Sequence, residues 1–146
     1  MAEIAEFTEK GIDYKHWFRS TDFKMRNNLD AVSHAACAMA VDLDAKCIVV
    51  SSLSGQTARM VSRFRCPADI LGMTLDEKVW RKLNLSWGVT PVLSEEYPSI
   101  EVVFYQALKA ASKRLNLTKG DNVVLTGGRI NGLPGGTNTI RVESVN

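Results

Sequence analysis

The chain has 146 residues, a formal net charge of +2, 45% hydrophobic residues and 23% charged residues. This composition is typical of one globular domain with a buried core, and so small a net charge gives no reason to expect nucleic acid or a membrane surface as a partner. The apolar runs are far shorter than the ~18 residues that cross a bilayer. Residues 1–10 contain three glutamates and no apolar run, so we do not expect a secretory signal there.

The cysteines at positions 37, 47 and 66 are odd in number, and their spacing does not match a metal site. Cys37 and Cys47 lie within apolar patterns. We therefore expect reduced thiols in a cytoplasmic protein, where they pack as small hydrophobic side chains, and no metal site.

Residues 1–26 form a mixed opening in which Gly11 interrupts any long helix. The aromatic residues at positions 14, 17 and 18 suggest a surface that packs against another part of a protein. His16 has no visible partner, so we expect it to be solvated or simply packed. We interpret residues 1–26 as a linking segment and residues 27–146 as the domain itself.

Asn28 is the predicted cap of the first long helix. Its apolar or small positions recur at helical spacing. They are Leu29, Val32, Ala36, Met39, Ala40 and Leu43. His34 lies in this helix, and we expect it to pack at the boundary of the core rather than to take part in chemistry.

The next stretch predicts a strand, a turn and a helix. Residues 47–51 form an apolar strand, and a helical pattern then continues to about Arg65. The turn between them reads Ser52-Leu53-Ser54-Gly55-Gln56-Thr57. The start of a helix leaves backbone N–H groups unpaired and carries a partial positive charge, so hydroxyls and a glycine there are typical of an oxyanion site, with phosphate the usual ligand. Similar turns also occur without any ligand.

The remaining sequence alternates strands with helices. Strands are predicted at residues 69–73, 87–93, 122–126 and 139–145. Thr74 and Glu77 form a capping box that would start a short helix. The longest helix follows Pro98 and runs to Leu115 with a wide apolar stripe. A glycine-rich loop, residues 127–136, separates the last two strands.

Strands that alternate with helices build a mostly parallel sheet covered by helices on both faces. The last connection contains no helix, so the final strand is predicted to be an antiparallel edge strand. The predicted fold class is therefore α/β, with a five-stranded mostly parallel sheet. Ligands of such sheets bind beyond the carboxyl ends of the strands. If the first and fourth strands are neighbours, the turn at residues 52–57 and the loop at residues 127–136 face one crevice.

The second loop holds five of the ten glycines of the chain, and it also holds Arg129. Glycine lets a backbone approach a ligand closely, and a guanidinium can pair with phosphate through two hydrogen bonds. The predicted phosphate-binding residues are Ser52, Leu53, Ser54, Gly55, Gln56, Thr57, Gly128, Arg129, Gly135, Gly136 and Thr137. A glycine-rich loop is also compatible with a plain connection.

Catalysis by these residues alone has little support in the sequence. Neither common nucleotide fingerprint, G-x-x-x-x-G-K-[ST] or G-x-G-x-x-G, occurs. The adjacent acids Glu95-Glu96 and Asp76-Glu77 do not face each other on a helix and are better explained as solvated charges. We expect no catalytic residue and no cofactor in this domain.

From about residue 28 to residue 145 the chain resembles the C-terminal domain of pyruvate kinase. The stretches that carry the resemblance are residues 45–50, 54–59, 61–65, 85–91, 119–121 and 136–142. Residues 1–26 resemble the segment that leads from the catalytic barrel of that enzyme into this domain.

The resemblance implies that the first and fourth strands are neighbours. It also implies that the whole enzyme is a glycolytic transferase, which moves phosphate from phosphoenolpyruvate to ADP with magnesium and potassium in a barrel that has no counterpart here. In the family this domain binds a phosphorylated allosteric activator and contributes to the tetramer interface. The family's phosphate contacts map onto residues 52–57, and its closing loop maps onto residues 127–137. The implied partners are the chain's own catalytic domain and further copies of the enzyme.

One departure from the family concerns the identity of the activator. Relatives activated by fructose 1,6-bisphosphate hold its second phosphate with a tryptophan and an arginine ahead of the fourth strand. Here that segment reads Ser94-Glu95-Glu96-Tyr97-Pro98. Two carboxylates there would repel a second phosphate, so we expect a sugar monophosphate or AMP, although Arg129 could offset the repulsion. The alternatives are a purely structural domain without a ligand and a free-standing enzyme that acts on a phosphorylated substrate.

Overall fold

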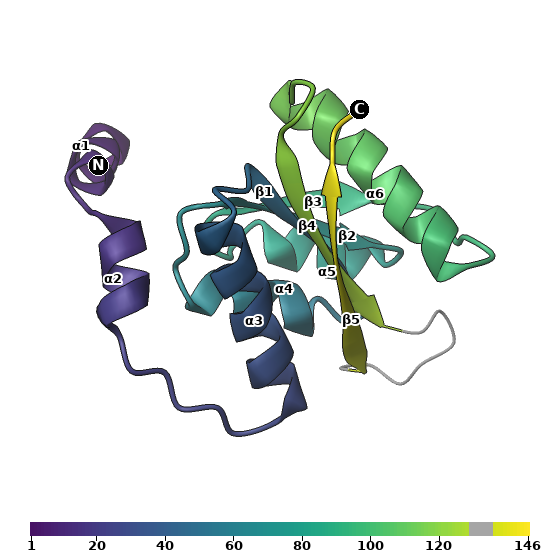
Figure 1. The fold of residues 1–146 in the computed structure, drawn as a ribbon, viewed down its shortest axis with the longest axis horizontal. Helices are drawn as coiled ribbons and strands as arrows, with labels where there is room; N and C mark the ends of the chain where they lie inside the picture. The colour runs from purple at the N-terminus through teal and green to yellow at the C-terminus, as the bar shows by residue number, and fades with distance from the viewer. Residues whose placement is uncertain (129–135) are drawn as a thin grey trace.

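The computed structural model describes residues 1–128 and 136–146. In this part of the chain one five-stranded sheet has the order β3-β2-β1-β4-β5 (Figure 1). The strands are β1 (Cys47–Ser51), β2 (Asp69–Thr74), β3 (Val89–Leu93), β4 (Asn122–Gly128) and β5 (Thr137–Ser144). The helices are α1 (Ala2–Lys10), α2 (Tyr14–Ser20), α3 (Asn28–Asp42), α4 (Gln56–Arg63), α5 (Glu77–Leu83) and α6 (Ile100–Leu115).

The strand pairing confirms the predicted fold. The pairs β1–β2, β1–β4 and β2–β3 are parallel, and β5 is antiparallel to β4 at the edge of the sheet. The neighbouring position of β1 and β4 also agrees with the sequence-based expectation. The short connection between β4 and β5 explains the antiparallel edge, because a parallel crossover needs about a dozen residues or more.

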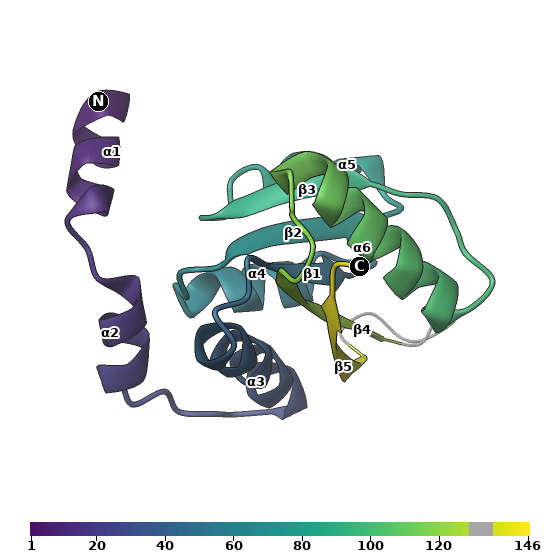
Figure 2. The same cartoon turned by 45° about the horizontal axis from the view of Figure 1, so that its top comes forward.

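Helices cover both faces of the sheet, as predicted (Figure 2). On one face, Ile48 and Val50 of β1 pack in a cluster with α3, α4 and α5. On the other face, Val49 of the same strand packs in a second cluster with Val103 and Phe104 of α6. Successive strand residues point to opposite faces, so a continuous apolar strand such as β1 is buried on both sides.

Helix α3 begins with Asn27 as its cap, one residue earlier than predicted. The side chain of Asn27 accepts a hydrogen bond from the Asp30 N–H at 2.9 Å. His34, in the middle of α3, stacks on the ring of Phe18 and contacts the edge of Phe64. Burial lowers the pKa of His34 from its ordinary value. The predicted boundary packing of His34 is confirmed.

The predicted capping box at Thr74 is wrong. Thr74 is the last residue of β2, and its hydroxyl donates to the Leu53 carbonyl at 3.3 Å. Helix α5 begins at Glu77 with Asp76 as its cap, and Asp76 accepts from the N–H groups of Lys78 and Val79. Thr74 pairs with Leu93 in the β2–β3 ladder, and its Oγ1 accepts from the Asp76 N–H at 3.3 Å rather than from an amide of α5.

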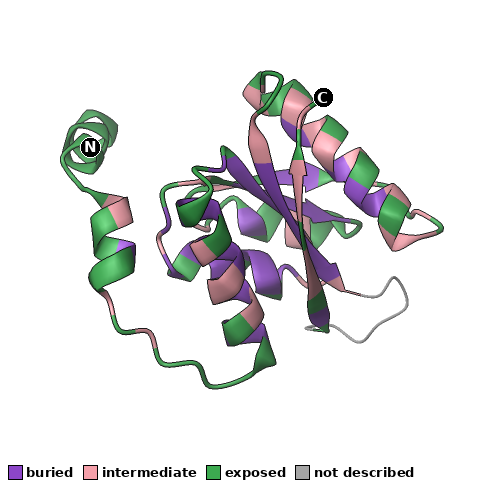
Figure 3. Cartoon of the chain, viewed as in Figure 1, coloured by how far each residue is buried: buried purple, intermediate pink, exposed green. Residues whose placement is uncertain are grey.

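The N-terminal helices lie to one side of the sheet, and no residue of α1 is buried (Figure 3). His16 in α2 is exposed, as expected. The cysteines behave as the sequence suggests, since Cys37, Cys47 and Cys66 are free and buried. Burial raises the pKa of the Cys47 thiol to about 12, which keeps it protonated at neutral pH.

Candidate oxyanion-binding site

The parallel strands end together at one edge of the sheet, and the loops after β1 and β4 leave that edge side by side. Ser51, the last residue of β1, pairs with Met73 on one side and with Gly127 on the other. The turn at residues 52–57 therefore starts next to the end of β4, in front of the sheet edge where ligands of open α/β sheets bind.

Gly55 gives the turn after β1 its shape. Its φ of +72° lies in the left-handed region, which glycine adopts without strain, and it is the N-cap of α4. Because glycine has no side chain, the cap makes no side-chain hydrogen bond to the first amides of α4. The Gln56 N–H lies 3.4 Å from the Ser54 hydroxyl, which is a weak contact. The start of α4 is thus suited to an anionic partner.

Two other residues of the turn are held by the neighbouring strand. The Ser52 N–H donates to the Met73 carbonyl at 2.9 Å. The Leu53 carbonyl accepts from the Thr74 hydroxyl, while the Leu53 side chain is 43% exposed. Thr74 is a supporting residue that sequence reasoning missed. Its role depends on the register of β2 against the turn, and no local sequence signal reveals that register.

A hydroxyl pair joins the two predicted loops. The Oγ1 atoms of Thr57, in the first turn of α4, and Thr137, at the start of β5, lie 2.6 Å apart. Thr57 is fully buried, and Thr137 is 7% exposed. The turn after β1 and the segment that returns from the second loop are therefore in direct contact, as the crevice hypothesis requires.

The two ends of the second loop also approach closely. A side chain added at Gly128 would place its Cβ 2.7 Å from the Gly136 carbonyl oxygen, so the backbone fits there only without a side chain. Arg129 and Gly135, which are both predicted contacts, lie outside the described residues. Of the eleven predicted site residues, the structure brings together the turn at residues 52–57 with Gly128, Gly136 and Thr137.

The segment that follows β3 is acidic. Glu95 and Glu96 are both exposed and precede α6. Arg59 is exposed on α4, one turn after the start of the helix. Within residues 1–128 and 136–146, no three His, Cys, Asp or Glu side chains come close enough to hold a metal ion. In the same residues no helix has the length and apolar character needed to cross a membrane.

The fold and this edge together define an α/β domain in which a glycine-capped helix, α4, starts at the carboxyl edge of a mostly parallel sheet. The family model described as "Pyruvate kinase, alpha/beta domain" matches residues 30–143. The chain belongs to this family.

Full-length relatives agree with the family match. The chain is 35% identical over 146 residues to the pyruvate kinase of Clostridium acetobutylicum, a match that covers 99% of this chain and 31% of the relative. It is 42% identical over 115 residues to the pyruvate kinase of Lactococcus lactis subsp. lactis, covering 79% of this chain and 22% of the relative. It is 40% identical over 116 residues to pyruvate kinase 2 of Synechocystis sp., covering 80% of this chain and 20% of the relative. The chain thus spans a third or less of the length of these relatives.

Proposed function

We propose that this chain is the regulatory domain of a pyruvate kinase and that it binds the phosphate of an allosteric effector between residues 52–57 and the two ends of the second loop. The observation that carries the proposal is the 2.6 Å contact between the hydroxyls of Thr57 and Thr137, which fastens the turn after β1 to the strand after the second loop. The whole enzyme would transfer phosphate from phosphoenolpyruvate to ADP, while this domain would not be catalytic by itself.

The phosphate would be held mainly by backbone N–H groups at the start of α4. Gly55 and Gln56 supply these amides, and the half-buried Ser54 supplies a hydroxyl beside them. Arg129 and Gly135 remain part of the proposed site. The hydroxyls of Thr57 and Thr137 would position the two segments, because each is buried and already hydrogen-bonded to the other.

A monophosphate is the proposed effector, namely a sugar monophosphate or AMP in preference to fructose 1,6-bisphosphate. The support is the pair of exposed carboxylates at Glu95 and Glu96, in the segment that leads from β3 to α6. Like charges raise the free energy of a bound second phosphate.

The proposed partners are the chain's own catalytic domain and further subunits. Strand β5 pairs only with β4 in the described sheet, so its outer edge is free to meet another chain. Helix α1 has no buried residue, and Ile4 and Phe7 are 65% and 82% exposed, which suits a helix that packs on another domain. No cofactor is proposed for this domain, and magnesium and potassium would belong to the barrel.

Isothermal titration calorimetry tests the effector proposal. Glucose 6-phosphate, ribose 5-phosphate, AMP and fructose 1,6-bisphosphate are titrated into the chain, and we expect at least one monophosphate to bind more tightly than the bisphosphate. Ser54→Ala should weaken that binding. Ser86→Ala is the matched control, because Ser86 precedes β3 at the opposite edge of the sheet. Absence of heat with all four compounds would contradict the proposal.

A purely structural domain that has lost its effector is the second candidate. The observation in its favour is that Thr57 and Thr137 satisfy each other's hydroxyls, so this contact needs no anion. In that case the full-length enzyme carrying Ser54→Ala would keep the activation of the parent enzyme. If the variant loses activation, the effector-binding role is supported instead.

A further inference from the structure

Helix α4 has one end in the candidate site and the other end in a cluster of aromatic rings. Its N-cap is Gly55, and Thr57 in its first turn contacts Thr137. Its C-cap is Phe64, which is fully buried. The helix has eight residues, which corresponds to a length of about 12 Å. One face of it is buried from end to end, so the helix is firmly packed against the domain.

The aromatic cluster at Phe64 holds the N-terminal arm, by which we mean residues 14–26. The ring of Phe23 meets the ring of Phe64 edge-on with centroids 4.9 Å apart, and His34 meets Phe64 at 5.3 Å. Phe18 stacks on His34 with a centroid distance of 5.2 Å. Phe18 is the buried residue of α2, with 6% of its surface exposed. The arm therefore touches the C-terminal end of α4 directly through Phe23.

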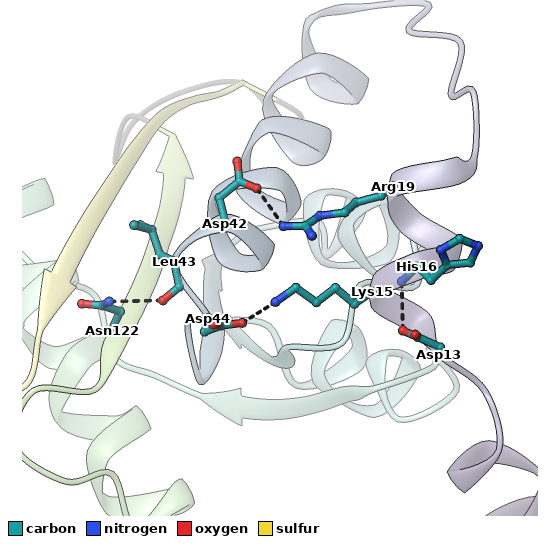
Figure 4. Close-up of polar contacts among 8 residues, drawn as sticks. All are labelled: Asp13, Lys15, His16, Arg19, Asp42, Leu43, Asp44 and Asn122. Atoms are coloured by element: carbon teal, nitrogen blue, oxygen red, sulfur yellow. Dashed lines mark hydrogen bonds and ion pairs between the residues drawn. The ribbon is translucent and has the colours of Figure 1, made fainter.

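The polar contacts of α2 with the domain are more exposed than this cluster. Figure 4 shows Lys15 and Arg19 reaching from α2 to the end of α3. The Nζ of Lys15 lies 2.7 Å from Oδ1 of Asp44, and the guanidinium of Arg19 lies 3.5 Å from Oδ1 of Asp42. Most of each acidic side chain faces solvent. Ion pairs of this kind contribute little to stability, so the buried aromatic contacts anchor α2.

A displacement of α4 would change the packing contacts at both of its ends. At the N-terminal end, the space around Gly55 is closed by α5, since an added Cβ would lie 2.8 Å from Cγ1 of Val79. At the C-terminal end, close packing of Phe64 against Phe23 and His34 leaves little room for independent movement. A short packed helix moves as one body, so a change at the turn would be transmitted to the rings that hold the arm.

We propose that α4 couples the oxyanion site to the N-terminal arm, so that a bound anion changes how firmly residues 14–26 dock onto the domain. The arm has two states, docked on the aromatic cluster or released from it. The oxyanion site at one end of α4 and the ring of Phe64 at the other end both affect this equilibrium through the position of α4. The inference rests on the proposed function for the identity of the ligand, but the coupling itself is a property of the ligand-free fold.

Hydrogen exchange of the arm tests the coupling without any ligand. The N–H groups of Trp17 and Thr21 are hydrogen-bonded within α2 and its cap, so their exchange reports release of the arm. Thr57→Val removes the hydroxyl contact at the site end of α4. We expect arm amides to exchange about fivefold faster or more, measured against the amides of the sheet. Thr137→Val removes the same contact from β5 and should have the same effect.

The matched control is Thr126→Val. Thr126 is fully buried on β4, and its hydroxyl donates to the Thr139 carbonyl at 3.0 Å, but it lies on the sheet rather than on α4. It should leave the exchange of the arm unchanged relative to the sheet. Equal effects of Thr57→Val and Thr126→Val, or unchanged arm exchange in both site variants, would overturn the coupling.

A ligand experiment separates this inference from the proposed function. Glucose 6-phosphate, ribose 5-phosphate, AMP and fructose 1,6-bisphosphate are each added to the unaltered chain, binding is measured by calorimetry, and exchange of the arm amides is followed in the same buffer. Binding accompanied by a change in the exchange of the arm amides supports both the proposed effector site and the coupling. If binding occurs while arm exchange stays constant, the coupling is wrong and the effector site stands. If none of the four effectors binds, the proposed function is wrong, and the three threonine variants still decide the coupling.

Discussion

Gly55 lies so close to Val79 that a single methyl group at position 55 would bring the start of α4 into collision with α5. The added Cβ would be 2.8 Å from Cγ1 of Val79 and 3.2 Å from Cδ2 of Leu83. The φ of Gly55 is +72°, so an alanine there is also strained in its backbone. We expect Gly55→Ala to lower the free energy of unfolding by about 2–4 kcal/mol, measured by urea denaturation.

Gly88→Ala separates the two causes. Gly88 has a similar φ of +66°, but no atom lies within 4 Å of its added Cβ. This variant should show the backbone strain alone, about 1–2 kcal/mol. Equal losses for the two variants would mean that α5 yields to the methyl group, and the tight fit between α4 and α5 would then be the wrong explanation.

The contact between Thr57 and Thr137 predicts a coupled pair of substitutions. Removing one hydroxyl leaves the other buried without its partner, so each single valine variant should lose about 1–3 kcal/mol of stability. The double variant has no unsatisfied hydroxyl left. We expect its loss to be clearly smaller than the sum of the two single losses, as determined by a double-mutant cycle in urea. Strictly additive losses would show that the hydroxyls do not stabilise each other.

The elements of the fold were predictable because local patterns and chain topology agree. The apolar run at β1, the wide stripe of α6 and the missing helix between β4 and β5 were enough to predict a mostly parallel sheet with an antiparallel edge. The neighbouring position of β1 and β4, taken from the family resemblance, then placed the two predicted loops at one edge.

The details of the site depend on contacts between distant residues. Thr57 and Thr137 are 80 positions apart, and no periodic pattern links them. Thr74 and Asp76 are both good cap residues, and the local sequence does not reveal that Asp76 is the one that accepts from the first amides of α5. The cluster of Phe18, His34 and Phe64 likewise joins three elements whose packing no local signal specifies.

His34 predicts a dependence of stability on pH. Burial lowers its pKa in the folded chain, and the rings packed on it, Phe18, Phe23 and Phe64, carry no charge. The guanidinium carbon of Arg63 lies over the Phe64 ring, 5.3 Å from its centroid. The folded state thus favours the neutral imidazole. Its contribution to stability is fully present above the ordinary histidine pKa of 6.5 and is lost as the pH falls through the lower folded pKa.

We therefore expect the free energy of unfolding to decrease from pH 7 towards pH 5, and His34→Phe to reduce that slope. The chain has two histidines, so His16→Gln is the natural control. Urea denaturation at a series of pH values gives the slope for each variant. If stability instead rises on acidification, attraction between imidazolium and the rings outweighs desolvation, and the sign assigned to His34 is incorrect.

Asp76 provides the last test, because it distinguishes the observed start of α5 from the capping box at Thr74. The N–H groups of Val79 and Lys78 donate to its carboxylate and lower its pKa. The stabilisation that this cap gives to the helix is therefore fully present above the ordinary aspartate pKa, and it is lost as the pH falls through the lower pKa of the folded state.

Substitutions at the two candidate caps provide the measurement. Asp76→Ala should accelerate hydrogen exchange of the Lys78 and Val79 amides, whereas Asp76→Asn should largely preserve their protection, since asparagine is also a good cap. Thr74→Val should leave these amides protected and loosen the turn at Leu53 instead, because its hydroxyl donates to the Leu53 carbonyl. If the Lys78 amide exchanged faster in Thr74→Val but not in Asp76→Ala, Thr74 rather than Asp76 would be the cap of the helix.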